Sequence, residues 1–246
     1  MADVLLTFAG SGEQQGVSEI SRRLGLSKAV VHRILRSLVS RRLVSLDEMS
    51  GGYRLGPAAA TLGARALRDL NLRENALPVL RRLQQESGET ATVSELVGVS
   101  RVYLDQAPSL KEVKMTVELG RPFPLHAGAS SRAIMAFAPP DLRQQILEGP
   151  LEALTPKTIV DREALELSIS HVASAGAAAS FGERQPGAAS VAAPLLGIDG
   201  HAVGAVSTCG PVDRFDEATV ERLLPLVRSA AHEVSSRIGR HGEGGI

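Results

Sequence analysis

The chain has 246 residues, which is more than one domain usually contains, so one large unit or two smaller ones are expected. Its apolar stretches are too short to cross a bilayer and no signal peptide is recognisable, so a cytoplasmic protein without a membrane partner is expected. Aromatic residues make up only 3% of the chain and Trp is absent, which argues against a stacking platform for single-stranded nucleic acid. The 27 Lys and Arg balance the 27 Asp and Glu, so net charge alone gives no reason to expect a polyanionic partner.

Three short helices are predicted at the N-terminal end. The first covers residues 3–9 and is followed by a loop over residues 10–16. Ser18 is expected to cap the second helix, which ends before Gly25 because glycine adopts the left-handed conformation that terminates helices. Ser27 then caps the third helix, residues 28–40.

The third helix has a clear helical period. Its apolar residues form one stripe, predicted to be buried: Val30, Val31, Ile34, Leu35, Leu38 and Val39. The opposite stripe holds Ala29, His32, Arg33, Arg36 and Ser40. The surrounding segment, residues 17–46, contains one acid and these cations: Arg22, Arg23, Lys28, Arg33, Arg36, Arg41 and Arg42. By charge alone, docking to a polyanion and a merely solvated face remain equally open.

A two-stranded hairpin follows, with strands over residues 43–46 and 53–55 around a polar turn. Two helices joined by a glycine turn and followed by a hairpin predict a winged helix-turn-helix, residues 1–56, whose third helix enters the major groove. The candidate contacts to double-stranded DNA are Ser27, Lys28, His32, Arg33, Arg36 and, in the wing, Arg54. The alternative is a three-helix module that docks to a protein.

A helical linker is predicted over residues 57–72, interrupted at Asn71, before a helix that ends at Ser87 and is kinked at Pro78. A second domain then covers residues 73–240. Its expected strands are 90–96, 102–106, 113–118, 188–195 and 202–207. Its expected helices are 130–137, 141–147, 165–175 and a long final helix, followed by a flexible tail, residues 241–246. The whole is an α+β chain.

A small-molecule pocket is expected in this second domain. Gly128 and Ala129 directly precede a predicted helix, whose free N–H groups favour an anion such as a carboxylate. Two late strands bring small polar side chains from Ser190, Ser207 and Cys209. The alternative is that the glycine only caps the helix and the serines fill a core.

The segment from Val17 to Leu35 resembles the helix-turn-helix of IclR-type bacterial regulators. So do Gly52–Gly56, Leu125–Ala129, Gly187–Pro194 and Ala205–Pro211, in order along both domains. The resemblance implies a transcriptional regulator that binds a pseudopalindromic operator as a homodimer or a dimer of dimers. It also implies a GAF-like C-terminal domain that binds a small effector.

The resemblance further implies ligand contacts at particular positions. The family's glycine–alanine pair matches Gly128 and Ala129, its acidic position matches Ser180 and its frequent cysteine matches Ser190. Its Ser-x-Ser matches Ser207 and Cys209, and Glu183 stands near enough to replace the missing acid. We therefore expect a small organic acid or an amino-acid-related metabolite.

The recognition helix departs from the family pattern. Ala29 and Val30 stand where the family often has Ser-Thr, which removes two potential hydroxyl contacts to DNA. The operator therefore cannot be inferred from relatives.

No enzymatic site is expected. The single cysteine, Cys209, allows neither an intrachain disulfide nor a Cys-based metal cage, and pairing it with a histidine as a nucleophile is the weaker interpretation. The glycines of residues 182–187 have Walker-type spacing, but Ala188 and Ala189 replace the Lys-Ser/Thr pair. We expect no metal and no cofactor. The rival hypothesis is a metabolite-binding enzyme with a vestigial DNA-binding head.

Overall fold

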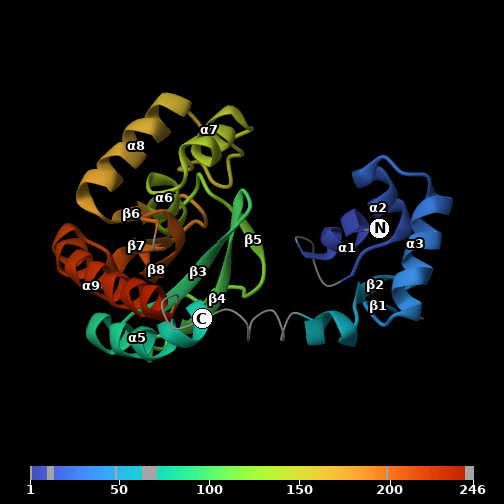
Figure 1. The fold of residues 1–246 in the computed structure, drawn as a ribbon, viewed down its shortest axis with the longest axis horizontal. Coiled ribbons are helices and arrows are strands. Elements are labelled where there is room, and N and C mark those ends of the chain that lie inside the picture. Colours follow the sequence, from blue (N-terminus) through green and yellow to red (C-terminus); the bar gives the residue numbers. More distant parts are fainter. Residues whose placement is uncertain (1, 10–13, 48, 63–70, 198, 242–246) are drawn as a thin grey trace. The chain divides into compact units, whose positions relative to one another are not determined.

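The chain divides into two units, residues 1–70 and 71–246, and the division falls inside the range 57–72 that the sequence suggests for a linker (Figure 1). The computed structural model describes residues 2–9, 14–47, 49–62, 71–197 and 199–241. Each unit has a hydrophobic core of its own.

In the first unit, three α-helices precede a hairpin. Its elements are α1 (Ala2–Leu6), a 3₁₀ turn (Thr7–Ala9), α2 (Val17–Leu24), α3 (Lys28–Ser40), β1 (Val44–Leu46) and β2 (Tyr53–Leu55). The two strands pair antiparallel, with Ser45 opposite Arg54. The predicted helix-turn-helix followed by a wing is thus the observed order.

The helix ends explain where these elements stop. The prediction that Ser18 caps α2 is wrong, because α2 begins one residue earlier at Val17, and Gly16 is the N-cap without a side-chain hydrogen bond. Gly25 has φ of 65°, a left-handed conformation that glycine adopts at little cost, and it ends α2 as expected. Ser27 caps α3 by accepting a hydrogen bond from the Val30 N–H, 3.4 Å away.

The core of the first unit forms around one face of α3. Val31, Leu35 and Leu38 are buried there. They pack in one cluster with residues from the other elements of the unit: Val4, Phe8, Ile20, Val44 and Tyr53. Burying this stripe fixes the opposite face of α3 outward.

Residues 57–62 are helical, and residues 63–70, which carry most of the predicted linker helix, lie outside the described residues. Asn71, the predicted interruption, is the first residue of α5 (Asn71–Ser87), and Pro78 lies inside that helix. In the rest of the second unit, the helices are α6 (Ala129–Ala136), α7 (Pro140–Glu148), α8 (Arg162–Ala175) and α9 (Glu217–His241).

The second unit is built on a six-stranded antiparallel sheet with the order β5-β4-β3-β8-β7-β6. The strands are β3 (Thr90–Val97), β4 (Ser100–Ala107), β5 (Pro122–Pro124), β6 (Ala178–Phe181), β7 (Ala188–Leu196) and β8 (Ala202–Pro211). Helices α5 and α9 pack on each other and on one side of the sheet, while α6 packs on β6, β7 and β8, with α8 against α6 (Figure 1). The resulting layers are those of an α+β domain.

The prediction of a strand at residues 113–118 is wrong. The alternating apolar residues there do turn inward, since Val117 is buried and Met115 packs beside Tyr103. Their backbone groups, however, bond to side chains instead of a neighbouring strand: Thr90 donates to the Met115 carbonyl, and the Gln106 amide bonds both N–H and C=O of Val117. The edge of β4 is instead covered by β5.

Two other boundaries differ from expectation. Strand β6, which lies at the outer edge beside β7, was not predicted. Helix α9 reaches His241, which the sequence placed in a flexible tail, and residues 242–246 lie outside the described residues.

Candidate DNA-binding and effector sites

The exposed face of α3 carries most of the residues predicted to contact DNA. Ser27, Lys28, His32, Arg33 and Arg36 are all exposed. The helix contains no acidic residue, and among the described residues none of its cations is in an ion pair. An acid-free, unpaired cationic face of this kind is suited to phosphate and base-edge contacts.

The first unit presents this face as helix-turn-helix proteins do. Helices α2 and α3 pack against each other across the turn at Gly25. The buried stripe of α3 is held by α1, α2 and the hairpin, so its polar stripe is left accessible along the whole helix. In such a motif the second helix of the pair is the one that enters the major groove.

The wing is a hairpin with an ordered turn. Asp47 Oδ1 accepts hydrogen bonds from the backbone N–H groups of Ser50 and Met49, at 3.2 and 2.9 Å, and these bonds lower the pKa of the Asp47 carboxyl below its usual value. Arg54, the residue predicted to contact DNA from the wing, is exposed on β2.

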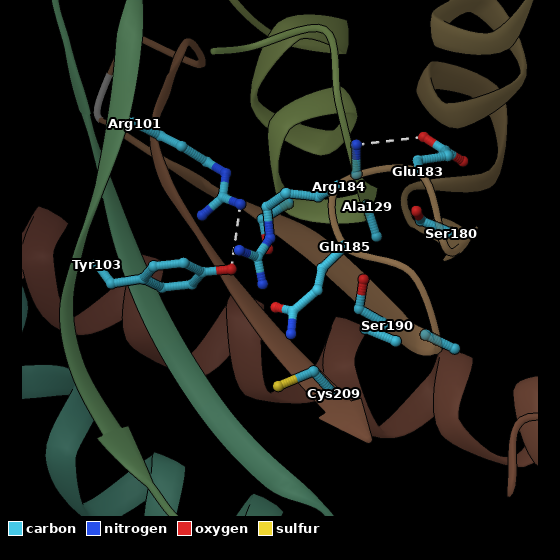
Figure 2. A pocket seen from close by; sticks show the side chains of 13 residues that line it. Arg101, Tyr103, Ala129, Ser180, Glu183, Arg184, Gln185, Ser190 and Cys209 are labelled. Carbon is cyan, nitrogen blue, oxygen red and sulfur yellow. Dashed lines mark hydrogen bonds between the residues drawn. The ribbon is translucent and has the colours of Figure 1, made fainter. Parts of the chain in front are cut away.

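A small cavity in the second unit collects most of the predicted effector residues. It has a volume of only about 20 Å³ and lies between β4, the start of α6, the β6–β7 connection and β8 (Figure 2). Of the seven predicted residues, six line it: Gly128, Ala129, Ser180, Glu183, Ser190 and Cys209.

The register of the sheet explains how three of these meet. Ser180 lies opposite Ser190, and Ser190 lies opposite Cys209, so β6, β7 and β8 contribute one side chain each to a single row. Ser207 lies two residues before Cys209 on β8 and is not among the lining residues. Its hydroxyl is instead 2.7 Å from the Thr92 hydroxyl on β3, in a buried pair.

The start of α6 is occupied by one of the protein's own carboxylates. Gly128, the N-cap, has φ of 90°, and its N–H donates to Glu183 Oε2 at 3.2 Å. The other Glu183 oxygen lies 2.7 Å from Arg132, with both side chains at most a tenth exposed. The position where the sequence predicted a ligand anion is therefore filled in part by Glu183.

The backbone of Glu183 is held as firmly as its side chain. Thr158 donates to the Glu183 carbonyl at 2.6 Å, and Thr155 donates to the Gly182 carbonyl at 2.7 Å. Glu183 therefore lines the cavity with its carboxylate committed to Arg132 and Gly128, which leaves it little capacity to replace a ligand-binding acid at Ser180.

The thiol of Cys209 is buried in the floor of the cavity. Burial raises its pKa to about 12, although the nearby Arg184 charge acts in the opposite direction. A thiol with this pKa is protonated at neutral pH and is a poor nucleophile. Cys209 therefore serves as packing or as a weak polar contact.

The lining residues that were not predicted from the sequence include Arg101, Tyr103, Arg184 and Gln185 (Figure 2). Arg101 is 1% exposed, and burial lowers the pKa of its guanidinium. Its only signal in the sequence was the alternation of Arg101 and Tyr103 with Val102 and Leu104, which leaves open which set faces the helices.

Membrane spans and metal sites were sought in the part of the chain that the structure describes. Across those residues, no helix is long and apolar enough to cross a membrane. No three His, Cys, Asp or Glu side chains gather there into a group that could hold a metal ion.

Two protein-family models match the chain. Residues 1–48 match the IclR helix-turn-helix domain, and residues 64–236 match the C-terminal domain of bacterial IclR transcriptional regulators. The chain is 34% identical to the glycerol operon regulatory protein of Streptomyces griseus, over 97% of this chain and 94% of that protein. It is 33% identical to the HTH-type transcriptional regulator BhcR of Paracoccus denitrificans, over 89% and 79%.

Solved structures of similar proteins superpose on nearly the whole chain. A putative IclR regulator from Silicibacter sp. TM1040 superposes with a TM-score of 0.87 at 30% identity, covering 97% of this chain and 95% of that one. An IclR homologue from Microbacterium hydrocarbonoxydans, in complex with 4-hydroxybenzoate, gives 0.76 at 28% identity and covers 96% of each. Both domains and their order are accounted for, and the chain belongs to the IclR family of DNA-binding bacterial transcriptional regulators, which are not enzymes.

Proposed function

We propose that this protein is a repressor of a metabolic operon, released from or locked onto its operator by a small organic acid or an amino-acid-related metabolite. The observation that carries the proposal is the exposed face of α3, where Lys28, Arg33 and Arg36 stand without acids on a helix-turn-helix scaffold. Relatives whose names describe operon regulation or repression support this choice, among them the glycerol operon regulatory protein and the AllR repressor of Escherichia coli.

The operator is proposed to be a pseudopalindrome read by a homodimer or a dimer of dimers in the cytoplasm. Each copy contributes residues 1–56 as the DNA-binding domain, and two-fold protein symmetry then places two recognition helices on matching half-sites. The contacts are assigned to Ser27, Lys28, His32, Arg33, Arg36 and, in the wing, Arg54.

The effector acts through residues 73–240, and residues 57–72 connect its domain to the DNA-binding head. A ligand changes DNA affinity only if it binds two arrangements of the dimer unequally. The cavity lined by Ser180, Ser190 and Cys209 supports a small polar ligand, and the 4-hydroxybenzoate complex of the Microbacterium homologue is consistent with an organic acid.

The test is a titration of the DNA upstream of the protein's own gene with the full-length protein at several salt concentrations. We expect specific binding that weakens steeply with salt, because cations displace counterions from phosphates. Arg33→Ala is expected to weaken binding at least about tenfold. Arg81→Ala, an exposed arginine on α5, is the matched control and leaves binding unchanged. Salt-insensitive binding, or equal effects of the two variants, contradicts the proposal and favours a protein-docking head.

A further inference from the structure

The most unusual group in the cavity is a buried arginine without a counter-ion. Arg101 is 1% exposed, and its Nε donates to the Ser131 hydroxyl at 2.7 Å while one terminal nitrogen donates to the Tyr103 hydroxyl at 3.1 Å. Its other terminal nitrogen, Nη1, has no hydrogen-bond partner among the described residues, and no carboxylate there pairs with Arg101. Guanidinium groups keep their charge in proteins, so this site holds a buried cation that no acid among the described residues neutralises.

A second cation lies beside it. The Arg101 guanidinium carbon is 4.4 Å from the centre of the Tyr103 ring and 5.4 Å from that of Phe123. The Arg184 guanidinium carbon lies 5.9 and 4.9 Å from the same two rings. Figure 2 shows both side chains directed into the cavity, Arg101 from β4 and Arg184 from the β6–β7 connection. Aromatic faces offset part of the cost of two like charges, but they do not neutralise them.

The nearest acid in the cavity lining does not serve these arginines. Glu183 lines the cavity, yet its carboxylate pairs with Arg132 at 2.7 Å and accepts from the Gly128 N–H. Cys209 is a neutral thiol. The cavity therefore has an excess of positive charge at its β4 end and small neutral groups, Ser190 and Cys209, at the other.

We propose that Arg101, assisted by Arg184, binds the carboxylate of the effector, whose body extends toward Ser190 and Cys209. The unpaired Nη1 supplies the donor that a carboxylate oxygen needs, and a buried charge-assisted bond of this kind is strong. The inference rests on the proposed function, because it names the ligand class of the same effector domain. The sequence placed the ligand anion at the start of α6, but Glu183 occupies that position. The proposed position is instead the side chain of Arg101.

The cost of the buried cation in the free protein can be measured without knowing the natural effector. Replacing a buried, unneutralised cation by an apolar side chain of similar length removes a desolvation cost. Arg101→Met is therefore expected to melt no lower than the wild-type protein. Arg121→Met is the matched control, because Arg121 stacks on the same Phe123 ring at 5.4 Å but is half exposed and paired with Glu118.

Binding is tested with propionate and benzoate against their neutral amides, propionamide and benzamide, at constant ionic strength. We expect the carboxylates to raise the melting temperature of the wild-type protein and of Arg121→Met, by roughly 5–10 °C at a hundredfold excess over the dissociation constant. The amides are expected to have little effect. In Arg101→Met the affinity for the carboxylates falls by roughly 10- to 100-fold.

Three results would overturn the inference: Arg101→Met melts several degrees lower than the wild-type protein, carboxylates and amides act alike, or neither carboxylate shifts the wild-type protein. Arg101→Gln, which keeps a polar side chain without the charge, provides a second variant for the binding measurement. The titration of upstream DNA is measured separately. Loss of DNA binding with carboxylate binding intact therefore refutes the proposed function and leaves the arginine site standing.

Discussion

Arg132 and Glu183 form a buried ion pair at 2.7 Å that joins α6 to the β6–β7 connection. Burial lowers the pKa of the Arg132 guanidinium, and the adjacent Glu183 charge opposes that shift. The same carboxylate accepts from the Gly128 N–H at the start of α6. Two walls of the cavity are thus connected by one acidic side chain.

Replacing this acid by Glu183→Gln leaves Arg132 buried with an uncompensated charge. We expect a loss of roughly 3–5 kcal/mol in the free energy of unfolding, measured by urea denaturation. Glu118→Gln is the control, because its pair with Arg121 is exposed and contributes at most about 1 kcal/mol. Equal losses in the two variants would show that the Arg132–Glu183 pair does not hold the cavity together.

Ser207 and Ser190 are expected to have separable effects. Ser207→Ala leaves the Thr92 hydroxyl without its partner at 2.7 Å, which costs roughly 1 kcal/mol of stability and does not alter binding of a carboxylate. Ser190→Ala changes the cavity lining and is expected to alter carboxylate binding with less effect on stability. Melting curves with and without benzoate measure both quantities, and the reverse pattern contradicts the placement of Ser207 outside the cavity.

The lowered pKa of the Glu89 carboxyl makes the stability of the fold depend on pH. Burial of this carboxyl would raise its pKa, but hydrogen bonds from Arg214 at 2.6 Å and Lys111 at 2.7 Å outweigh burial and hold the pKa below its usual value of 4.5. A group whose pKa is lower in the folded state stabilises the fold above its unfolded pKa. This stabilisation is therefore complete above about pH 4.5 and is lost as the pH falls further.

Glu89→Gln isolates this contribution. We expect the variant to be less stable than the wild-type protein by roughly 1–3 kcal/mol at pH 7, with a difference that shrinks toward pH 3. Thermal unfolding followed by circular dichroism across this range gives the comparison. A difference that stays constant with pH would mean that the pairing with Arg214 and Lys111 is not what stabilises Glu89.

Cys209 is the only cysteine of the chain, so thiol reagents report on a single site. Its pKa of about 12 predicts very slow labelling by a disulfide reagent at pH 8 in the folded protein, and rapid labelling after unfolding in urea. Since Cys209 lines the cavity, benzoate is expected to slow labelling further in the wild-type protein. Fast labelling of the folded protein would contradict a buried, protonated thiol.

The DNA-binding head was largely predictable from the sequence because its elements are determined by residues that are close together along the chain. Helical periodicity separates Val31 and Leu35 from Arg33 and Arg36 on α3, and the glycine at position 25 marks the turn. The cavity was predictable only in part. The small residues of β7 and β8 follow the family pattern, but pairing between distant strands decides which of them share a row.

Arg101 was missed for the same reason. Whether it faces the helices depends on the register of β4 against β3, which shifts at Val93 and Ser94. The role of Glu183 depends on its ion pair with Arg132, which lies 51 residues away in the sequence, so the sequence alone did not reveal it. Residues 113–118 resemble a strand because inward-facing apolar residues alternate there. Their backbone groups, however, form hydrogen bonds to side chains such as that of Gln106 instead of to a neighbouring strand.

The proposed regulatory function depends on sequence-specific DNA recognition by the exposed face of α3. Selection from a random duplex library with the purified full-length protein tests this recognition most directly. We expect enrichment of an inverted repeat, with half-sites about one helical turn apart or a multiple of it. Arg33→Ala is predicted to abolish or change the enriched half-site, whereas Arg81→Ala leaves it intact. A selected pool no different from the input, or the same repeat selected by Arg33→Ala, would contradict DNA recognition by α3.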